Sequence, residues 1–298
     1  QVRTGERVVA ARETANGAVA EILHADGTRS ERACDILVGA DGIHSALRQQ
    51  FYPDEGAPRW NGMMMWRGTT LARPFLDGRT MVQAGHRRAK FVVYPIEPVR
   101  PDGLQRINWI CDRRLREDGF GGGLTAPSRE DWSKPGSLDD LLPTFGSWRF
   151  AWLDVPGLIR AAEQILEWPM VDRDPLPRWR HGHTTLLGDA AHPMYPIGSN
   201  GATQAILDAA ALADALDGHA SITAALNAYE AARLPMTRDI VAMNRREGLD
   251  AILDMVEEAA PEGFARIEDV TDPTVLAEWV QAYKKAAGHQ VGRPQSAP

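Results

Sequence analysis

The sequence predicts an α/β protein (α+β overall) in which a domain built on parallel strands is interrupted by an inserted antiparallel sheet. Two apolar runs, Cys34–Ala40 and His183–Asp189, each lead into a motif of glycine and aspartate, and such runs are typical of buried parallel strands. The region between them consists of apolar stretches separated by proline and glycine turns, which indicates antiparallel strands. Alanine-rich helical sequence follows the second run. One domain split by an insertion explains all three observations.

The composition is that of a globular protein with a negative charge. The chain has 298 residues, of which 44% are hydrophobic and 24% charged, and the length is sufficient for two domains. A net charge of −7 argues against nucleic acid as a partner, because phosphate binding needs a basic face. The two cysteines cannot form a disulfide framework, so we expect a cytoplasmic protein. No apolar run reaches the roughly 20 residues of a membrane span.

The first fifty residues predict a β-meander followed by a strand, a turn and a helix. Asn16-Gly17 is a strong hairpin signal between two strand-like stretches. The predicted strands are Arg7–Ala11, Ala18–His24 and Cys34–Ala40, and the predicted helix is Ser45–Gln50.

The middle of the chain predicts the inserted antiparallel sheet. Its clearest strands are Gly62–Gly68, Lys90–Pro95 and Gln105–Ile110. The glycine-rich stretch 119–123 is interpreted as a loop, because no strand leads into it as a dinucleotide fingerprint requires.

The last third of the chain is predicted to be helical. The expected helices are Ala202–Leu216, Ile222–Asn244 (with Pro235 as a point of bending), Leu249–Ala259 and Pro273–Ala287. Helical spacing predicts that the first of them packs through one face. That face comprises Ile206, Ala209, Ala210, Ala213 and Leu216.

These elements predict three parts of the chain. Residues 1–52 and 181–247 form the discontinuous nucleotide-binding domain, residues 53–180 form the inserted substrate domain, and residues 248–298 form C-terminal helices and a tail.

The two strand ends carry the most informative chemistry. Asp41 and Asp189 are 148 residues apart (189 minus 41), and each lies where an open α/β sheet presents ligand-binding groups. A carboxylate there can accept hydrogen bonds from ribose or ribityl hydroxyls. The small residues beside it let a cofactor approach closely.

A third motif is the turn Pro196–Gly201, which leads directly into a helix. The N-terminus of a helix offers unpaired amides and a partial positive charge, so it can bind a phosphate or the electron-rich edge of a flavin pyrimidine. The alternative is a simple helix cap at Ser199 or Asn200.

These motifs resemble those of class A FAD-dependent aromatic-ring monooxygenases, the p-hydroxybenzoate hydroxylase-like superfamily. The stretch 38–48 resembles the Asp-Gly motif of that family, and 186–201 resembles its Gly-Asp motif and flavin-contacting turn. The stretches 65–68 and 169–177 resemble the branch that includes 5-methylphenazine-1-carboxylate 1-monooxygenase. The resemblance extends over about residues 1–247. It implies a Rossmann-like FAD/NAD(P)-binding domain.

The resemblance also implies roles for individual residues. The implied cofactor-binding residues are Asp41, Gly42, Arg48, Gly188, Asp189, Ala190, Pro196, Gly198, Asn200, Gly201 and Ala202. The implied substrate pocket contains Met64, Trp66, Tyr195 and Pro196. For Arg48 a solvent-facing side chain is the alternative to a phosphate contact. For the Met63–Trp66 run the alternative is the core of the sheet.

By resemblance, the reaction is hydroxylation of an aromatic or heteroaromatic small molecule. NADH or NADPH would reduce FAD, and O2 would form a C4a-hydroperoxide that transfers oxygen to the ring. We therefore predict no catalytic side chain. We also predict no metal site, since no carboxylate or cysteine cluster supports His181, His183 and His192. The late helices could mediate a homodimer.

One departure from the family leaves alternatives open. Family members carry a Gly-x-Gly-x-x-Gly fingerprint before the Asp-Gly motif. In this sequence forty residues, beginning with Gln1, precede Asp41, and they contain no such fingerprint. We expect either a fragment or a truncated gene product without the first βαβ unit. A flavin-free remnant that binds a ligand or a partner is one alternative. A non-hydroxylating flavin oxidoreductase is the other, although the halogenase motif Trp-x-Trp-x-Ile-Pro is absent.

Two further features keep two interpretations each. Arg67 could bind a substrate carboxylate or form a surface ion pair. The acidic and basic run Asp172–Asp174 is interpreted as a local charge network or a turn rather than an acid–base pair.

Overall fold

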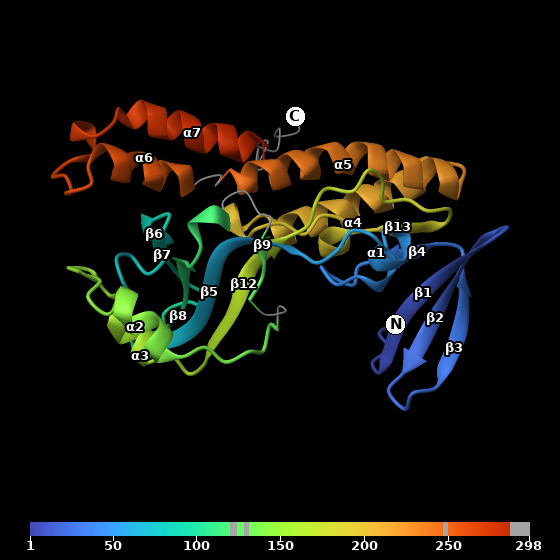
Figure 1. Cartoon of the computed structure of the whole chain (residues 1–298), viewed down its shortest axis with the longest axis horizontal. Helices are drawn as coiled ribbons and strands as arrows, with labels where there is room; N and C mark the ends of the chain where they lie inside the picture. Colours follow the sequence, from blue (N-terminus) through green and yellow to red (C-terminus); the bar gives the residue numbers. More distant parts are fainter. Residues whose placement is uncertain (120–123, 128–130, 247–249, 287–298) are drawn as a thin grey trace. The chain divides into compact units, whose positions relative to one another are not determined.

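The computed structural model describes residues 1–119, 124–127, 131–246 and 250–286. The chain divides into two compact units (Figure 1). Unit 1 comprises Gln1–Arg59, Asp172–Leu249 and Ala277–Pro298. Unit 2 comprises Trp60–Val171 and Asp250–Leu276. Unit 2 contains most of the predicted insertion. The segment 248–298, predicted as a separate part, is divided between the units. The roles assigned to these domains stay predictions.

Unit 1 begins with the predicted β-meander. Its strands are β1 (Glu6–Thr14), β2 (Gly17–His24) and β3 (Arg29–Cys34), which pair antiparallel in that order. Thr14 pairs with Gly17 across the turn, as the Asn-Gly signal predicts. Cys34 ends β3 and does not begin the next strand, so that boundary was predicted wrongly.

The two Gly/Asp motifs follow a pair of parallel strands. These are β4 (Leu37–Gly39) and β13 (Thr184–Leu186), and both are shorter than predicted. Helix α1 (Ala46–Phe51) comes next after β4 and is capped by Ser45, whose Oγ accepts a hydrogen bond from the Arg48 amide at 3.0 Å. A short 3₁₀ helix (Gly188–Ala190) follows β13.

Two long helices, α4 (Gly201–Gly218) and α5 (Ile222–Arg245), lie side by side in unit 1 (Figure 1). Their bounds agree with the sequence prediction, but the packed face of α4 was predicted wrongly. Ile206 is 70% exposed, and the buried residues of α4 are Gln204, Asp208, Leu212 and Ala215. Polar side chains occupy the interior here because a buried arginine of α5 pairs with them, as described below.

Unit 2 contains the predicted antiparallel sheet, with strand order β12-β5-β8-β7-β6 and β9 paired to β5. The strands are β5 (Arg59–Ala72), β6 (Val82–His86), β7 (Ala89–Pro95), β8 (Gln105–Arg114), β9 (Leu124–Thr125) and β12 (Ile165–Asp172). The glycine-rich stretch predicted as a loop lies, at residues 120–123, outside the described residues, after a 3₁₀ turn (Glu117–Gly119).

One face of this sheet packs against helices α2 (Leu138–Phe145) and α3 (Val155–Arg160). The ring of Phe91 on β7 lies 6.3 Å from Phe145 and 6.2 Å from Trp109 on β8, measured between ring centroids. Thr70 Oγ1 on β5 donates to the Leu158 carbonyl at 2.7 Å. A small hairpin, β10 (Arg149–Phe150) and β11 (Leu153–Asp154), connects the two helices.

The C-terminal helices are α6 (Ala251–Ala259) and α7 (Pro273–Ala286), close to the predicted bounds, with a 3₁₀ turn (Ile267–Asp269) between them. Within unit 2, the Arg87 amide donates to Asp254 of α6 at 3.0 Å. None of the described helices combines the length and apolarity needed to cross a membrane.

Candidate cofactor site

The parallel pair β4–β13 brings the two Gly/Asp motifs together. Gly39 and Leu186 are direct partners in the register, and the Leu187 amide donates to the Gly39 carbonyl at 2.9 Å. Asp41 and Asp189 therefore follow the carboxyl ends of neighbouring parallel strands, where α/β sheets present ligand-binding groups. The predicted position of the two motifs, at the carboxyl ends of parallel strands, is confirmed.

Asp189 has a carboxylate that is ready to accept hydrogen bonds. Its side chain is exposed, and no hydrogen-bond donor contacts it within the described part of the chain. An added Cβ at Gly201, the first residue of α4, would lie 3.9 Å from Asp189 Oδ1. The surrounding protein partly desolvates the carboxyl and raises its pKa, while the charge of His192 acts in the opposite direction.

Gly188 lets this turn approach α4 closely. Its φ of +60° is in the left-handed region, and an added Cβ would lie 3.1 Å from the Ala205 Cβ. The Gly188 amide donates to Asp208 Oδ2 of the same helix at 3.0 Å. The turn that carries Asp189 is therefore fixed directly against α4.

Replacing Gly188 with alanine is expected to destabilise unit 1 by more than backbone strain alone. A left-handed alanine costs about 1–2 kcal/mol, and the close contact with Ala205 adds to that. Gly27→Ala is the matched control, because Gly27 has a φ of +85° with nothing within 4 Å of an added Cβ. Urea denaturation should give a larger loss for Gly188→Ala than for Gly27→Ala, and equal losses would contradict the close packing.

The turn before α4 has the geometry of an anion-binding helix terminus. Gly198 and Ser199 have φ angles of 72° and 56°, and Ser199 is one of the few non-glycine residues with such a conformation. The first amides of α4 have no acceptor within the helix, and no side chain caps them in the described structure. The simple helix cap by Ser199 or Asn200 is therefore not what the structure shows. Of the predicted flavin-contacting residues here, Pro196 and Ala202 are exposed, Gly198 and Gly201 are half-buried and Asn200 is buried.

Asp41 already has a structural function. Its Oδ2 accepts a hydrogen bond from the Ala46 amide at 2.8 Å, and Gly42 beside it has a φ of +79°. The Asp-Gly motif thus forms the turn that begins α1. A role in cofactor binding for Asp41 and Gly42 stays a prediction.

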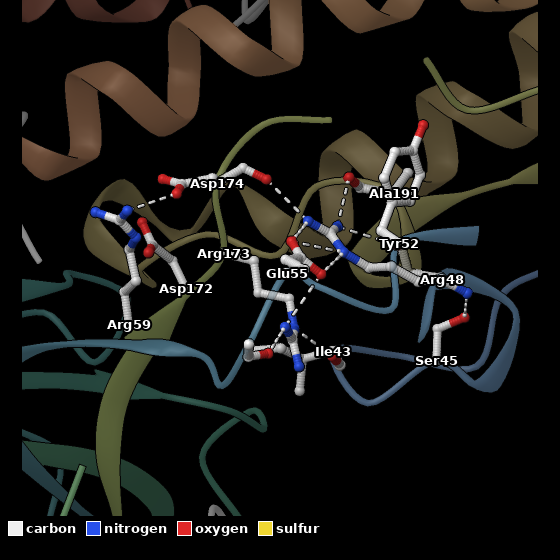
Figure 2. A network of polar contacts seen from close by, with 12 residues as sticks. Ile43, Ser45, Arg48, Tyr52, Glu55, Arg59, Asp172, Arg173, Asp174 and Ala191 are labelled. Carbon is white, nitrogen blue, oxygen red and sulfur yellow. Dashed lines mark hydrogen bonds and ion pairs between the residues drawn. The ribbon is translucent and has the colours of Figure 1, made fainter. Parts of the chain in front are cut away.

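Arg48 is buried, and this corrects both interpretations of it. The side chain is 1% exposed, and all of its N–H groups donate to protein oxygens (Figure 2). Nη1 donates to the carbonyls of Ala190 and Ala191 at 3.1 and 2.9 Å, Nη2 donates to the Asp174 carbonyl at 2.8 Å, and Nε and Nη2 bind Glu55. No donor is left for a phosphate or for solvent. Arg48 instead holds the backbone that directly follows Asp189.

The charge network continues through the run 172–174, as the sequence indicates (Figure 2). Arg173 shares Glu55 with Arg48 and donates to the Ile43 carbonyl at 2.8 Å. Asp172 accepts two hydrogen bonds from Arg245 of α5, at 2.7 and 2.9 Å. Burial raises the pKa of Asp172 to about 6, although Arg245 favours its ionised form.

Beneath the Asp189 turn lies a second buried network that sequence reasoning missed. Asp208, which is fully buried, accepts hydrogen bonds from His192 Nε2 at 2.5 Å, from the Gly188 amide and from Arg233 Nε of α5 at 2.7 Å. Arg233 also donates to Gln204 Oε1 at 2.7 Å. Burial opposes ionisation of Asp208, but these hydrogen bonds prevail and hold its pKa below the ordinary value. The available signal was the spacing of Asp208, which follows Gln204 by four residues in an alanine-rich helix and so lies on the same helix face.

The four residues predicted to line the substrate pocket are divided between the two units, with Met64 and Trp66 in unit 2 and Tyr195 and Pro196 in unit 1, so the pocket stays a prediction. Met64 and Trp66 are 5% and 3% exposed inside unit 2, and Trp66 Nε1 donates to Glu167 at 3.0 Å. This is the sheet core that the sequence left open as the alternative. Tyr195, in unit 1, is 1% exposed, and its hydroxyl points to the Arg59 carbonyl at 3.4 Å. Pro196 is the exposed member of the set.

The residues of unit 1 fit a bound flavin nucleotide. They provide an unpartnered carboxylate at a strand end, a glycine turn held against a helix and uncapped amides at the N-terminus of that helix. Carboxylate oxygens suit ribityl hydroxyls, and the amides suit an electron-rich edge.

Comparison with known proteins agrees with this geometry. A family model described as an FAD binding domain matches residues 156–244. Phenazine 1,6-dicarboxylic acid hydroxylase PhzS of Lysobacter antibioticus is 46% identical over 245 residues, which cover 82% of this chain and 56% of that protein. 3-Amino-4-hydroxybenzoate 2-monooxygenase PtmB3 of Streptomyces platensis is 38% identical over 229 residues, which cover 75% of this chain and 52% of that protein. The chain thus spans about half the length of these relatives.

The fold is that of solved flavin monooxygenases. A salicylate hydroxylase in complex with its substrate aligns with a TM-score of 0.66 at 23% identity, over 98% of this chain and 72% of that one. This similarity concerns the fold, and the family is identified by the relatives that are 46% and 38% identical to this chain. The chain belongs to the class A FAD-dependent aromatic monooxygenases, the p-hydroxybenzoate hydroxylase-like family.

Proposed function

We propose that this chain provides the flavin-binding and substrate-binding parts of a monooxygenase that hydroxylates an aromatic carboxylic acid with NADH or NADPH and O2. The observation that carries the proposal is Asp189, an exposed carboxylate without a donor in the described structure, at a strand end beside the N-terminus of α4. Bound FAD would supply the redox chemistry that the side chains of this chain lack.

In this proposal each group in unit 1 has one task. The Asp189 carboxylate accepts hydrogen bonds from ribityl hydroxyls, and the amides of Gly201 and Ala202 bind the electron-rich edge of the ring. Gly188 and Gly198 keep side chains out of the space that the cofactor needs. Pro196 is exposed on the same turn and would contact the flavin ring. Asp208 and Arg48 are positioning residues that hold the turn from below.

The substrate class is inferred from the relatives. Both relatives described above are named for aromatic carboxylic acids, a phenazine dicarboxylic acid and a hydroxybenzoate. We therefore propose a planar aromatic substrate with at least one carboxylate. A cytoplasmic location and a homodimer stay part of the proposal as sequence-based predictions.

Flavin binding tests the central claim. Titration of the purified chain with FAD, followed by flavin fluorescence and visible absorption, is expected to show saturable binding. Asp189→Asn should weaken it about 10- to 100-fold, because a hydrogen bond to a charged group contributes about 1.5–3 kcal/mol. Asp214→Asn is the matched control, since Asp214 is an exposed aspartate on α4, and it should bind FAD as the parent does.

Two results would contradict the proposal. Absence of FAD binding would favour the flavin-free ligand-binding alternative, and equal affinities for the parent and Asp189→Asn would remove the role of this carboxylate. Hydroxylation is tested separately, by NADH or NADPH consumption in the presence of aromatic carboxylates and by mass spectrometry for a product with one added oxygen atom. Consumption without such a product would favour a non-hydroxylating oxidoreductase.

A further inference from the structure

Helix α6 contacts the β6–β7 hairpin of unit 2 through its acidic side. In the described structure none of its nine residues is buried. The hydrogen bonds and ion pairs to the hairpin come from three carboxylates, those of Asp250 directly before the helix, Asp254 and Glu257. Positions three and four apart lie on one face of a helix, so the apolar residues Ile252 and Val256 lie on the opposite side. The attachment of α6 to the hairpin is therefore polar.

Asp250 makes two of these contacts. Its Oδ2 forms an ion pair with Nζ of Lys90 on β7, and its Oδ1 accepts a hydrogen bond from Nε2 of Gln83 on β6 at 2.5 Å. The side chains of Asp250 and Lys90 are 13% and 7% exposed. Because little water reaches this ion pair, its attraction is stronger than that of a surface pair. Asp250 thus holds the N-terminal end of α6.

The other two contacts lie nearer to solvent. Asp254 Oδ1 accepts a hydrogen bond from the Arg87 amide at 3.0 Å. Glu257 Oε2 lies 3.4 Å from Nδ1 of His86, and these two side chains are half-exposed. Exposed pairs of this kind add little to stability. The attachment of α6 to the hairpin therefore depends chiefly on Asp250.

Lys90 is shared between two carboxylates. Its Nζ also lies 3.0 Å from Oδ2 of Asp112, its cross-strand partner on β8, which is buried. Asp112 Oδ1 has no hydrogen-bond partner among the described residues. Burial raises the pKa of Asp112, Lys90 opposes that shift and Asp250 adds to it. Two acids and one base thus share a place with little water, and the two acids disfavour each other.

This arrangement lets Asp250 leave without depriving Lys90 of a partner. Breaking an isolated buried ion pair is strongly destabilising, because it leaves one charge uncompensated. Here Lys90 keeps Asp112 when Asp250 moves into water, and the pair that remains is neutral. Since α6 buries none of its described residues, its release from the hairpin exposes little apolar surface. Segments with these properties open locally at a small fraction of the global free energy of unfolding.

α6 covers part of one face of the unit 2 sheet. Phe91 and Trp109 belong to the first face, which contacts α2 through Phe145. Neighbouring residues of a strand point to opposite faces, so Lys90 belongs to the second face, next to the edge strand β6. Release of α6 from the hairpin therefore uncovers Lys90 on this second face.

We propose that α6 is a detachable strap over the second face of the unit 2 sheet, held closed by the ion pair between Asp250 and Lys90. In the closed state Asp250 completes the cluster and covers Lys90. In the open state Lys90 pairs with Asp112 alone and faces solvent. The inference goes beyond the proposed function and does not depend on it, because every group of the cluster belongs to unit 2.

Hydrogen–deuterium exchange of the purified chain at pH 7.5, followed by mass spectrometry, tests the strap. Asp250→Asn should accelerate exchange of the α6 amides about tenfold or more, because the ion pair that holds the helix is lost. The core amides of Phe91 and Trp109 should exchange as in the parent. Asp254→Asn leaves the Lys90 cluster intact and should give a smaller acceleration.

Chemical labelling of Lys90 measures the uncovering directly. With an amine-acylating reagent, Lys90 should react faster in Asp250→Asn than in the parent, each measured against Lys134, whose side chain is 42% exposed. Glu258→Gln is the matched control, since Glu258 is an exposed acid of the same helix. This variant should leave both exchange and labelling unchanged.

Three results would overturn the inference: α6 exchange in Asp250→Asn at the rate of the parent, an acceleration that Glu258→Gln reproduces, or Lys90 labelling that does not increase. Equal acceleration of the α6 amides and of the Phe91 and Trp109 amides would also overturn it, because it would show global destabilisation rather than local release. Neither measurement involves FAD. Failure of the strap therefore leaves the proposed function standing, and absence of FAD binding leaves the strap standing.

Discussion

Asp208→Asn is expected to lower the free energy of unfolding by about 3–5 kcal/mol, because it leaves the buried Arg233 without its charge partner. Asp208 is fully buried and accepts hydrogen bonds from Gly188, His192 and Arg233. An asparagine keeps the shape but brings one acceptor and two donors to a place that has only donors. Urea denaturation measures the loss, and FAD titration should show weaker binding, since the turn that carries Asp189 is released.

The control for this prediction is Asp214→Asn on the exposed side of the same helix, which should change stability by less than about 0.5 kcal/mol. A loss for Asp208→Asn no larger than that would show that the network contributes nothing to the free energy of unfolding.

The stabilisation by Asp208 also depends on pH. Since the pKa of Asp208 is held below its ordinary value of 3.8, the stabilisation is complete at neutral pH and is lost as pH falls through the folded-state pKa. The difference in free energy of unfolding between the parent and Asp208→Asn should therefore become smaller below about pH 4.

Arg48→Met is expected to destabilise unit 1 by a similar amount, about 3–5 kcal/mol. It would leave the Ala190, Ala191 and Asp174 carbonyls without their donor and remove one of the two arginines that share Glu55. Arg48→Lys should fall between parent and methionine, because an ammonium has three donors and no planar fork. Both substitutions should also weaken FAD binding, as Ala190 and Ala191 directly follow Asp189.

Gln49→Met tests the same helix without the network, since Gln49 is the exposed neighbour of Arg48 on α1. It should be nearly neutral in both denaturation and FAD titration. If Arg48→Lys matched the parent in both measurements, the assignment of Arg48 as the residue that positions the Asp189 turn would be wrong.

The elements of the fold that depend on local pattern could be predicted from the sequence. The Asn-Gly turn, the two strands that lead into Gly/Asp motifs and the long helices were found within a few residues of their observed bounds. The position of Asp189 could be predicted too, because a carboxylate that follows a buried parallel strand lies at the carboxyl edge of the sheet.

The side chains that depend on distant partners could not be predicted. Periodicity selected the apolar face of α4, with Ile206, whereas the structure buries Gln204 and Asp208. Trp66 was assigned to a pocket because alternation distinguishes two faces of a strand and does not say which face meets the helices. Its hydrogen-bond partner, Glu167, lies 101 residues further along the chain.

The sequence by itself thus determined which family the chain belongs to and where its Gly/Asp motifs stand. Only the tertiary structure decided that Arg48 is a buried positioning residue and that Arg67 pairs with Asn108. The physical reason is common to both cases. A charged or polar group is stable in the interior only where other segments supply its hydrogen bonds, and for Arg48 they come from carbonyls 142 and 143 residues further along the chain. Such partners are created by folding and leave no periodic signal in the sequence.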